Sequence, residues 1–402
     1  MPHHEVALIE TLAIGLTLAF GAGLLAVRLR LPPLIGYLLA GIAVGPFTAG
    51  FVADATLAPQ LAEIGVMLLM FGVGMHFSIG DLWAVRKIAI PGAIGQIVVA
   101  TALGAGVAHF FGWPLEAGLM FGLALSVAST VVLLRALEDR DLLKTNDGRI
   151  AVGWLIVEDL VMVLALVLLP ALASSVAPRA GHLATGNLWV AIGLTLAKVV
   201  AFSALMLVVG GRVFPWLLKR VEKTGSRELF TLAVIVLSLG VAFGSAELFG
   251  VSLALGAFFA GLVIHESDLS HRAANELLPL QGVFGALFFV SVGMLFDPGV
   301  LVREPLRVLE TIGIIVIGKS LAAFVIVRLL RGSRQTALTV SAALAQIGEF
   351  SFILATLGVG LGLLNFESQS LIVAGALLSI TLNPLVFNFV ARRAPKAAKP
   401  LR

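Results

Sequence analysis

Apolar runs of about twenty residues follow one another along almost the whole of this 402-residue chain. A run of that length can cross the hydrocarbon of a bilayer as a helix. Because lipid offers no hydrogen-bond partners to the backbone, only helices or closed barrels cross it. The alternation of apolar and polar residues that is typical of barrel strands is absent. The sequence therefore predicts an all-α, polytopic membrane protein.

Polar, Gly-rich or basic breaks divide the chain into thirteen predicted crossings. They cover residues 5–27, 32–46, 58–75, 86–110, 115–136, 150–175, 187–211, 228–247, 251–265, 278–297, 302–330, 336–360 and 366–391. We expect one transmembrane domain over residues 1–402 that ends in a basic cytoplasmic tail at 392–402.

The composition excludes several classes of function. Hydrophobic residues make up 59% of the chain and the mean hydropathy is +1.06, so the expected partner is the lipid bilayer. The chain contains no Cys, which excludes disulfides, thiol catalysis and thiolate metal sites. No nucleophile, base and orienting group recur together in the loops, so we expect neither an enzyme nor a bound cofactor.

Basic residues indicate how the chain is oriented in the membrane. Most of the 27 Lys and Arg residues fall in loops on one side of the predicted crossings, and only Arg179, Arg303 and Arg307 fall on the other. Cytoplasmic loops carry the excess of basic residues. This predicts an N terminus outside and a C terminus in the cytoplasm, and it accounts for the net charge of +4 without nucleic acid.

Two parts of the chain resemble each other at an offset of about 220 residues. Leu69–Met75 recurs as Phe288–Met294, and Ala19–Gly21 recurs as Ala242–Gly244. Seven crossings separate the two starts, and an odd number inverts the orientation. The pattern predicts two inverted six-helix repeats, near 5–175 and 228–391, joined by a linker helix near 187–211. Secondary transporters with a site at the bilayer midplane have this architecture.

Two corresponding crossings contain polar residues where a spanning helix should be apolar. One reads Leu125-Ser-Val-Ala-Ser-Thr-Val131, and the other reads Ala345-Gln-Ile-Gly-Glu-Phe-Ser351. Both patterns predict discontinuous helices, whose free ends can contact ions. Ser129 and Thr130 are candidate ligands, although a hydroxyl of this kind also bonds to its own helix in many proteins.

Glu158 and Asp159 lie side by side in the apolar run 150–169. A carboxylate inside a membrane is costly and usually handles an ion or a proton. Neighbours on one helix point about 100° apart, so one can line an ion cavity while the other meets a counter-charge. Lys319 is the expected counter-charge, and Lys198 is the alternative. With two carboxylates and one ammonium, one monovalent cation or one proton would make the site neutral.

The motifs that hold these residues identify the chain as resembling a known family. They are Leu68–Met75, Ser129-Thr130, Gly153–Asp159, Gly256–Gly261, Phe288–Met294, Gly318-Lys319 and Gln346–Phe350. Over residues 5–394 the chain resembles the membrane domain of Kef-type monovalent cation:proton antiporters, with most similarity to the YbaL branch.

The resemblance implies an NhaA-like fold with crossed discontinuous helices, and a homodimer. It implies that Asp159 binds the cation and the proton in turn, that Glu158 precedes it, and that Lys319 is the membrane lysine. Gln346 and Glu349 match the second discontinuous helix.

Kef relatives usually continue into a cytoplasmic nucleotide-binding domain, which we expect to be separate or missing here. We expect exchange of K⁺, or alternatively Na⁺, for protons by alternating access. A gated K⁺ channel and a solute:sodium symporter remain the alternatives.

Overall fold

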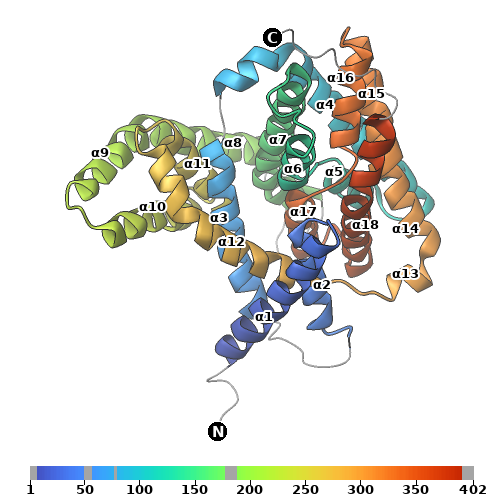
Figure 1. Ribbon diagram of the computed structural model, residues 1–402, viewed down its shortest axis with the longest axis horizontal. Coiled ribbons are helices and arrows are strands. Elements are labelled where there is room, and N and C mark those ends of the chain that lie inside the picture. Colours follow the sequence, from blue (N-terminus) through green and yellow to red (C-terminus); the bar gives the residue numbers. More distant parts are fainter. Residues whose placement is uncertain (1–6, 49–56, 77–78, 177–187, 392–402) are drawn as a thin grey trace. The chain divides into compact units, whose positions relative to one another are not determined.

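The computed structural model describes residues 7–48, 57–76, 79–176 and 188–391. Every regular element in these ranges is a helix, as Figure 1 shows. Within these ranges, ten helices are long and apolar enough to cross a membrane, and three shorter apolar helices accompany them. The all-α membrane class is therefore confirmed. The total of thirteen crossings and the inverted repeats stay predictions, and the tail at 392–402 lies outside the described residues.

The chain divides into two compact units whose segments alternate along the sequence. Unit 1 contains residues up to Leu25, then 36–77 and 163–294; unit 2 contains 26–35, 78–162 and 295–402. Each unit draws on both of the predicted repeats, so neither unit coincides with one repeat. Three helices run through a boundary between units: α1 (Ala7–Arg28), α2 (Pro33–Ala43) and α7 (Asn146–Val176).

Unit 1 is built around α3 (Leu57–His76), which packs along both α11 (Leu253–His265) and α12 (Ser270–Met294). Glycine makes this packing close: a Cβ at Gly74 would lie 2.1 Å from the carbonyl oxygen of Phe258. The other helices of the unit are α8 (Leu188–Leu205), the π-helical η1 (Met206–Gly210), α9 (Gly211–Glu222) and α10 (Arg227–Phe249). Helices α9, α10 and α11 contact one another, as Figure 1 shows.

Unit 2 contains both discontinuous helices and the charged residues Glu158, Asp159 and Lys319 that the sequence singled out. Its long element α4 (Ile79–Phe110) packs against α5 (Leu115–Leu125) and α15 (Lys319–Leu329). Its remaining elements are α6 (Thr130–Glu138), α13 (Val300–Arg303), α14 (Pro305–Ile312), the π-helical η2 (Gly313–Gly318), α16 (Arg334–Ala343), α17 (Glu349–Gly360) and α18 (Phe366–Ala391).

Local sequence explains where several helices begin and end. Ser252 caps α11 and Ser333 caps α16, each by accepting a hydrogen bond from the N–H three residues later. α10 ends at Gly250, whose φ of 64° lies in the left-handed region that glycine adopts without a steric cost.

Candidate functional site

The first break in a helix lies in unit 2, between α5 and α6. α5 ends at Leu125 and α6 begins at Thr130, so the discontinuity predicted there is confirmed. Ser129 has an extended backbone, and its Oγ accepts a hydrogen bond from the N–H of Val132 at 3.4 Å. A hydroxyl at this position satisfies a free N–H of the new helix, which explains why the helix restarts here.

The second break lies between α16 and α17 in the same unit. α16 ends at Ala343 and α17 begins at Glu349, which confirms the second predicted discontinuity. A Cβ at Gly348 would lie only 2.4 Å from the Cα of Ser129. Glycine alone permits such an approach of two backbones. The two breaks therefore touch, as expected for discontinuous helices that cross.

A buried amide side chain joins the two breaks. Gln346 is fully buried, and its Oε1 accepts a hydrogen bond from the N–H of Ser129 at 2.8 Å. Its Nε2 donates to the carbonyl oxygen of Ser129 at 3.2 Å and to that of Ala343 at 3.3 Å. Residues 217 positions apart in the sequence are thereby held in direct contact.

The two adjacent carboxylates of α7 both face the first break. Oε2 of Glu158 accepts a hydrogen bond from the N–H of Ala128 at 2.8 Å, and Oδ2 of Asp159 accepts one from the hydroxyl of Thr130 at 3.3 Å. Glu158 is fully buried and Asp159 is 5% exposed. The second oxygen of each carboxylate is buried without a hydrogen-bond partner among the described residues. Such an oxygen can accept a proton or a monovalent cation.

Lys319 is also fully buried, at the point where the π-helical segment η2 gives way to α15. Its Nζ donates to the backbone carbonyl of Gln346 at 3.0 Å, so the ammonium satisfies an acceptor of the second break. Glu158 and Lys319 attract each other electrostatically. However, no ion pair with a nitrogen–oxygen distance of 4.0 Å or less joins them within the described ranges. Lys198, the alternative counter-charge, is exposed in unit 1.

Glu349 adds a third buried carboxylate, which the sequence placed only at the start of the second half-helix. It is 5% exposed, and it is the main like-charge neighbour of Asp159. The hydroxyl of Ser129 interacts with its carboxylate. When every group is ionised, the three carboxylates and Lys319 carry a net charge of −2, rather than the −1 expected from the sequence. The signal for it was an acidic residue in an otherwise apolar run.

A second buried amide, Gln96 on α4, was not predicted from the sequence. Its Nε2 donates to the carbonyl oxygen of Ser126 at 2.9 Å, and its Oε1 accepts from the indole N–H of Trp154 at 3.3 Å. Gln96 thus satisfies the carbonyl at the end of α5 and ties it to α7. An isolated amide inside an apolar run was the available signal.

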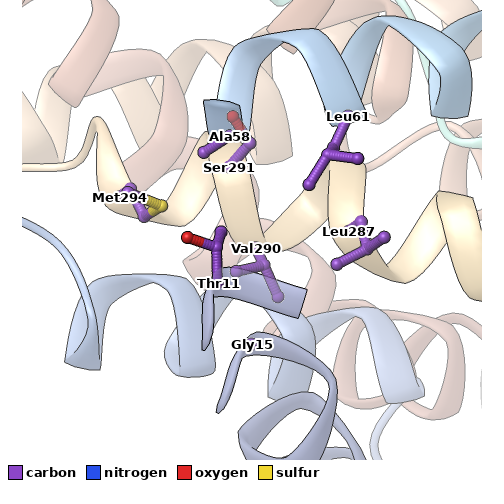
Figure 2. A pocket seen from close by; sticks show the side chains of 8 residues that line it. All are labelled: Thr11, Gly15, Ala58, Leu61, Leu287, Val290, Ser291 and Met294. Atoms are coloured by element: carbon purple, nitrogen blue, oxygen red, sulfur yellow. The ribbon is translucent and has the colours of Figure 1, made fainter. Parts of the chain in front are cut away.

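A pocket in unit 1 differs in chemistry from this cluster. It lies between α1, α3 and α12, and its lining residues are Thr11, Gly15, Ala58, Leu61, Leu287, Val290, Ser291 and Met294 (Figure 2). Among these described lining residues, the polar side chains are the two hydroxyls of Thr11 and Ser291, and none is ionisable. The pocket therefore does not offer the charge that a proton or cation site needs.

Comparisons with known proteins bear on the cluster in unit 2. Residues 15–393 match the transmembrane family described as sodium/hydrogen exchanger. The chain is 60% identical over 394 residues to YbaL of Escherichia coli K12, whose name describes a cation/proton antiporter, and the match covers 98% of this chain and 70% of YbaL. It is 32% identical to K(+) efflux antiporter 4 of Arabidopsis thaliana, over 96% of this chain and 64% of that protein.

A solved structure shows a similar fold. The sodium proton antiporter MjNhaP1 of Methanocaldococcus jannaschii superimposes with a TM-score of 0.71, covering 96% of this chain and 98% of that one at 18% sequence identity. At this identity the likeness concerns the fold alone. Taken together, these relatives do not favour the channel or the symporter alternative.

Proposed function

The chain belongs to the sodium/hydrogen exchanger family and is a cation/proton antiporter rather than an enzyme, and from this premise we propose that it exchanges K⁺ for protons at Asp159. The preference for K⁺ over Na⁺ rests on the relative from Arabidopsis thaliana, which is named for K⁺ efflux. The observation that carries the assignment to Asp159 is its unpartnered, buried Oδ1 beside two touching helix breaks.

Asp159 is the member of the cluster best suited to alternate between ligands. Glu158 is occupied by the backbone of Ala128 and is attracted by Lys319. Asp159 accepts one weak hydrogen bond from the described part of the chain, from Thr130 at 3.3 Å, and its charged neighbours there are carboxylates. A carboxylate in this setting gains from binding either a proton or a cation, and one ligand excludes the other. Ser129 and Thr130 supply hydroxyls at the same break.

Charge balance favours a conformational change with a proton or a cation bound at Asp159 over the same change with neither ligand bound. A neutral core crosses a low-dielectric region at much lower cost than a charged one. With Glu158 offset by Lys319, a proton or a monovalent cation on Asp159 neutralises that carboxylate. The third carboxylate, Glu349, then requires a proton of its own in the loaded state. Alternating access with Asp159 always occupied follows from these charges.

The test is cation-driven proton flux in proteoliposomes that contain the purified chain. Li⁺, Na⁺, K⁺ and Rb⁺ are added in turn, and the internal pH is followed with a trapped dye. We expect K⁺ to give the highest apparent affinity and Asp159→Asn to give no flux. Flux in Asp159→Asn equal to that of the wild type would contradict the assignment.

The orientation and the homodimer are also proposals. The distribution of Lys and Arg supports an N terminus outside and a C terminus in the cytoplasm of a bacterial inner membrane. Because the chain has no Cys, single cysteines introduced at Thr224 and Glu304 would report on opposite sides when labelled with a membrane-impermeant reagent. The homodimer rests on family resemblance, and the mass of the detergent-solubilised protein by light scattering tests it.

A further inference from the structure

The side chain of Gln346 is used in an unusual way. It contacts the main chain of Ser129 through both of its polar atoms, as an acceptor from the N–H at 2.8 Å and as a donor to the carbonyl at 3.2 Å. Exchanging the oxygen and nitrogen of the amide would place donor against donor and acceptor against acceptor, so the hydrogen bonds fix its orientation. The N–H and the carbonyl belong to the two peptide groups that flank the Cα of Ser129, together called the Ser129 peptide here, and the amide holds both of them in position.

The Ser129 peptide controls what lies next to Asp159. Ser129 caps α6 through its own Oγ, and the following residue, Thr130, places its hydroxyl 3.3 Å from Oδ2 of Asp159. Rotation of the Ser129 peptide would therefore move the first turn of α6 and the Thr130 hydroxyl with it. Gln346 does not contact Asp159 in the hydrogen bonds of the described residues, so it can act on Asp159 only through Ser129 and Thr130.

The far side of Gln346 is fixed as well. Its backbone carbonyl accepts from Nζ of Lys319 at 3.0 Å, and its Nε2 also reaches the carbonyl of Ala343 at the end of α16. Both anchors are buried. Gln346 is therefore hydrogen-bonded both to residues around the second break and to Ser129 at the first break. The distance between the two breaks cannot change unless some of these hydrogen bonds break.

We propose that Gln346 is a positioning residue that sets the affinity and the size preference of the cation site at Asp159 by fixing the Ser129 peptide. This inference rests on the proposed function. Cation sites discriminate by the number, spacing and flexibility of their ligands, so a site with a rigid wall separates ions of different radius better than a loose one. Loss of the hydrogen bonds between Gln346 and Ser129 should therefore weaken cation binding and reduce the difference in affinity among ions.

Asn383 provides a matched control in the same unit. It is a buried amide on α18, and its Nδ2 donates to the carbonyl of Ala342 at 3.0 Å, also near the end of α16. It makes no hydrogen bond to the first break. Asn383→Leu removes a buried hydrogen bond from α16 while leaving the link between the breaks intact.

The experiment measures apparent KM and maximal rate for Li⁺, Na⁺, K⁺ and Rb⁺ in proteoliposomes of the wild type, Gln346→Met and Asn383→Leu. Gln346→Met removes three hydrogen bonds, two of them to Ser129. Loss of the two bonds to Ser129 predicts that the KM for the preferred cation rises about tenfold and that the four KM values move closer together. The maximal rate should stay within about threefold, because a lost binding interaction raises KM rather than lowering the turnover. Asn383→Leu should leave all four KM values within about twofold.

Gln346→Asn is the second variant, because its shorter amide cannot reach both groups of Ser129, and it should behave as Gln346→Met does. Unchanged KM values and unchanged ion preference in a folded Gln346 variant would overturn the inference, and so would equal changes in Asn383→Leu. Failure of both Gln346 variants to fold would also overturn it, because the amide would then be a requirement of the fold. Absence of cation-dependent flux in the wild type would instead reject the proposed function.

Discussion

The two units of this protein bury different kinds of polar group. Unit 2 contains all four buried ionisable side chains of the described residues, Glu158, Asp159, Lys319 and Glu349. The buried polar side chains of unit 1 are hydroxyls, at Thr11, Ser238, Ser245, Ser267 and Ser291. A buried charge is costly to keep, whereas a hydroxyl can be satisfied by its own helix. Within the described residues, unit 2 alone therefore buries groups that can exchange a charged ligand.

Unit 1 brings its helices into close contact at glycines, as unit 2 also does at Gly122. Gly41, Gly74, Gly261 and Gly293 each face a carbonyl oxygen that would lie 2.0–2.2 Å from an added Cβ. Helices in lipid gain little from apolar burial alone, so small residues that bring backbones together are a main source of packing energy. The contrast predicts that substitutions in unit 2 change transport, while substitutions at these glycines change stability.

The largest expected effect is in unit 2. Asp159→Asn removes the carboxylate that accepts a hydrogen bond from Thr130 at 3.3 Å and whose charged neighbours are carboxylates. We therefore expect complete loss of exchange with no loss of thermal stability, because a desolvated charge is also removed. Ser291→Ala, which removes a buried hydroxyl of unit 1, should retain exchange. Proteoliposome flux and a thermal unfolding curve measure the two properties. Loss of exchange in both variants would erase the difference between the units.

Lys319→Met tests whether stability in unit 2 also depends on buried charge. The variant loses the hydrogen bond to the Gln346 carbonyl and leaves Glu158 without its attracting charge. Breaking a buried pair costs about 3–5 kcal/mol, and a hydrogen bond to a charged group contributes about 1.5–3 kcal/mol. Because the two groups are not in direct contact, Glu158→Gln added to Lys319→Met should recover only part of the loss. No recovery would indicate that Lys319 acts through Gln346 alone.

Gly74→Ala tests the opposite side of the comparison. The added methyl would meet the Phe258 carbonyl at 2.1 Å, and overpacking of this kind costs about 1–3 kcal/mol. Gly244→Ala is the matched control in unit 1, because nothing lies within 4 Å of the added Cβ. We expect a lower unfolding temperature only for Gly74→Ala, with unchanged exchange per folded molecule. A Gly74→Ala protein as stable as the control would refute the packing argument.

The smallest expected effect concerns a surface pair of unit 2. The hydrogen bond from Arg303 lowers the pKa of Asp297, in the loop before α13. Its contribution to stability is therefore complete above the unfolded pKa of about 3.9 and is lost as the pH falls through the lower folded pKa. Arg303→Gln should cost less than about 1 kcal/mol at pH 7, and this cost should shrink as the pH falls through the folded pKa of Asp297, measured by denaturant unfolding. A cost independent of pH would exclude the pair as its cause.

The sequence predicted the parts of this arrangement that local chemistry determines. Polar residues in apolar runs indicated both helix breaks, and the isolated charges at Glu158, Asp159 and Lys319 indicated a buried cluster. What it could not predict depends on contacts between distant segments. The link from Gln346 to Ser129 depends on a tertiary contact between residues far apart in the sequence. The π-helical turn before Lys319 has no sequence pattern that would predict it. The alternation of the two units along the chain likewise follows from tertiary packing.

The most direct test of the account measures apparent cation affinity as a function of pH. If a cation and a proton compete for Asp159, the apparent affinity falls about tenfold for each pH unit below the ionisation of that carboxylate and levels off above it. Proteoliposomes with equal pH on both sides, assayed over a series of K⁺ concentrations, give this slope. We predict a slope of about one on the acid limb in the wild type. An affinity that stays constant across that limb would mean that the cation and the proton use separate sites, and exchange at a single carboxylate would be contradicted.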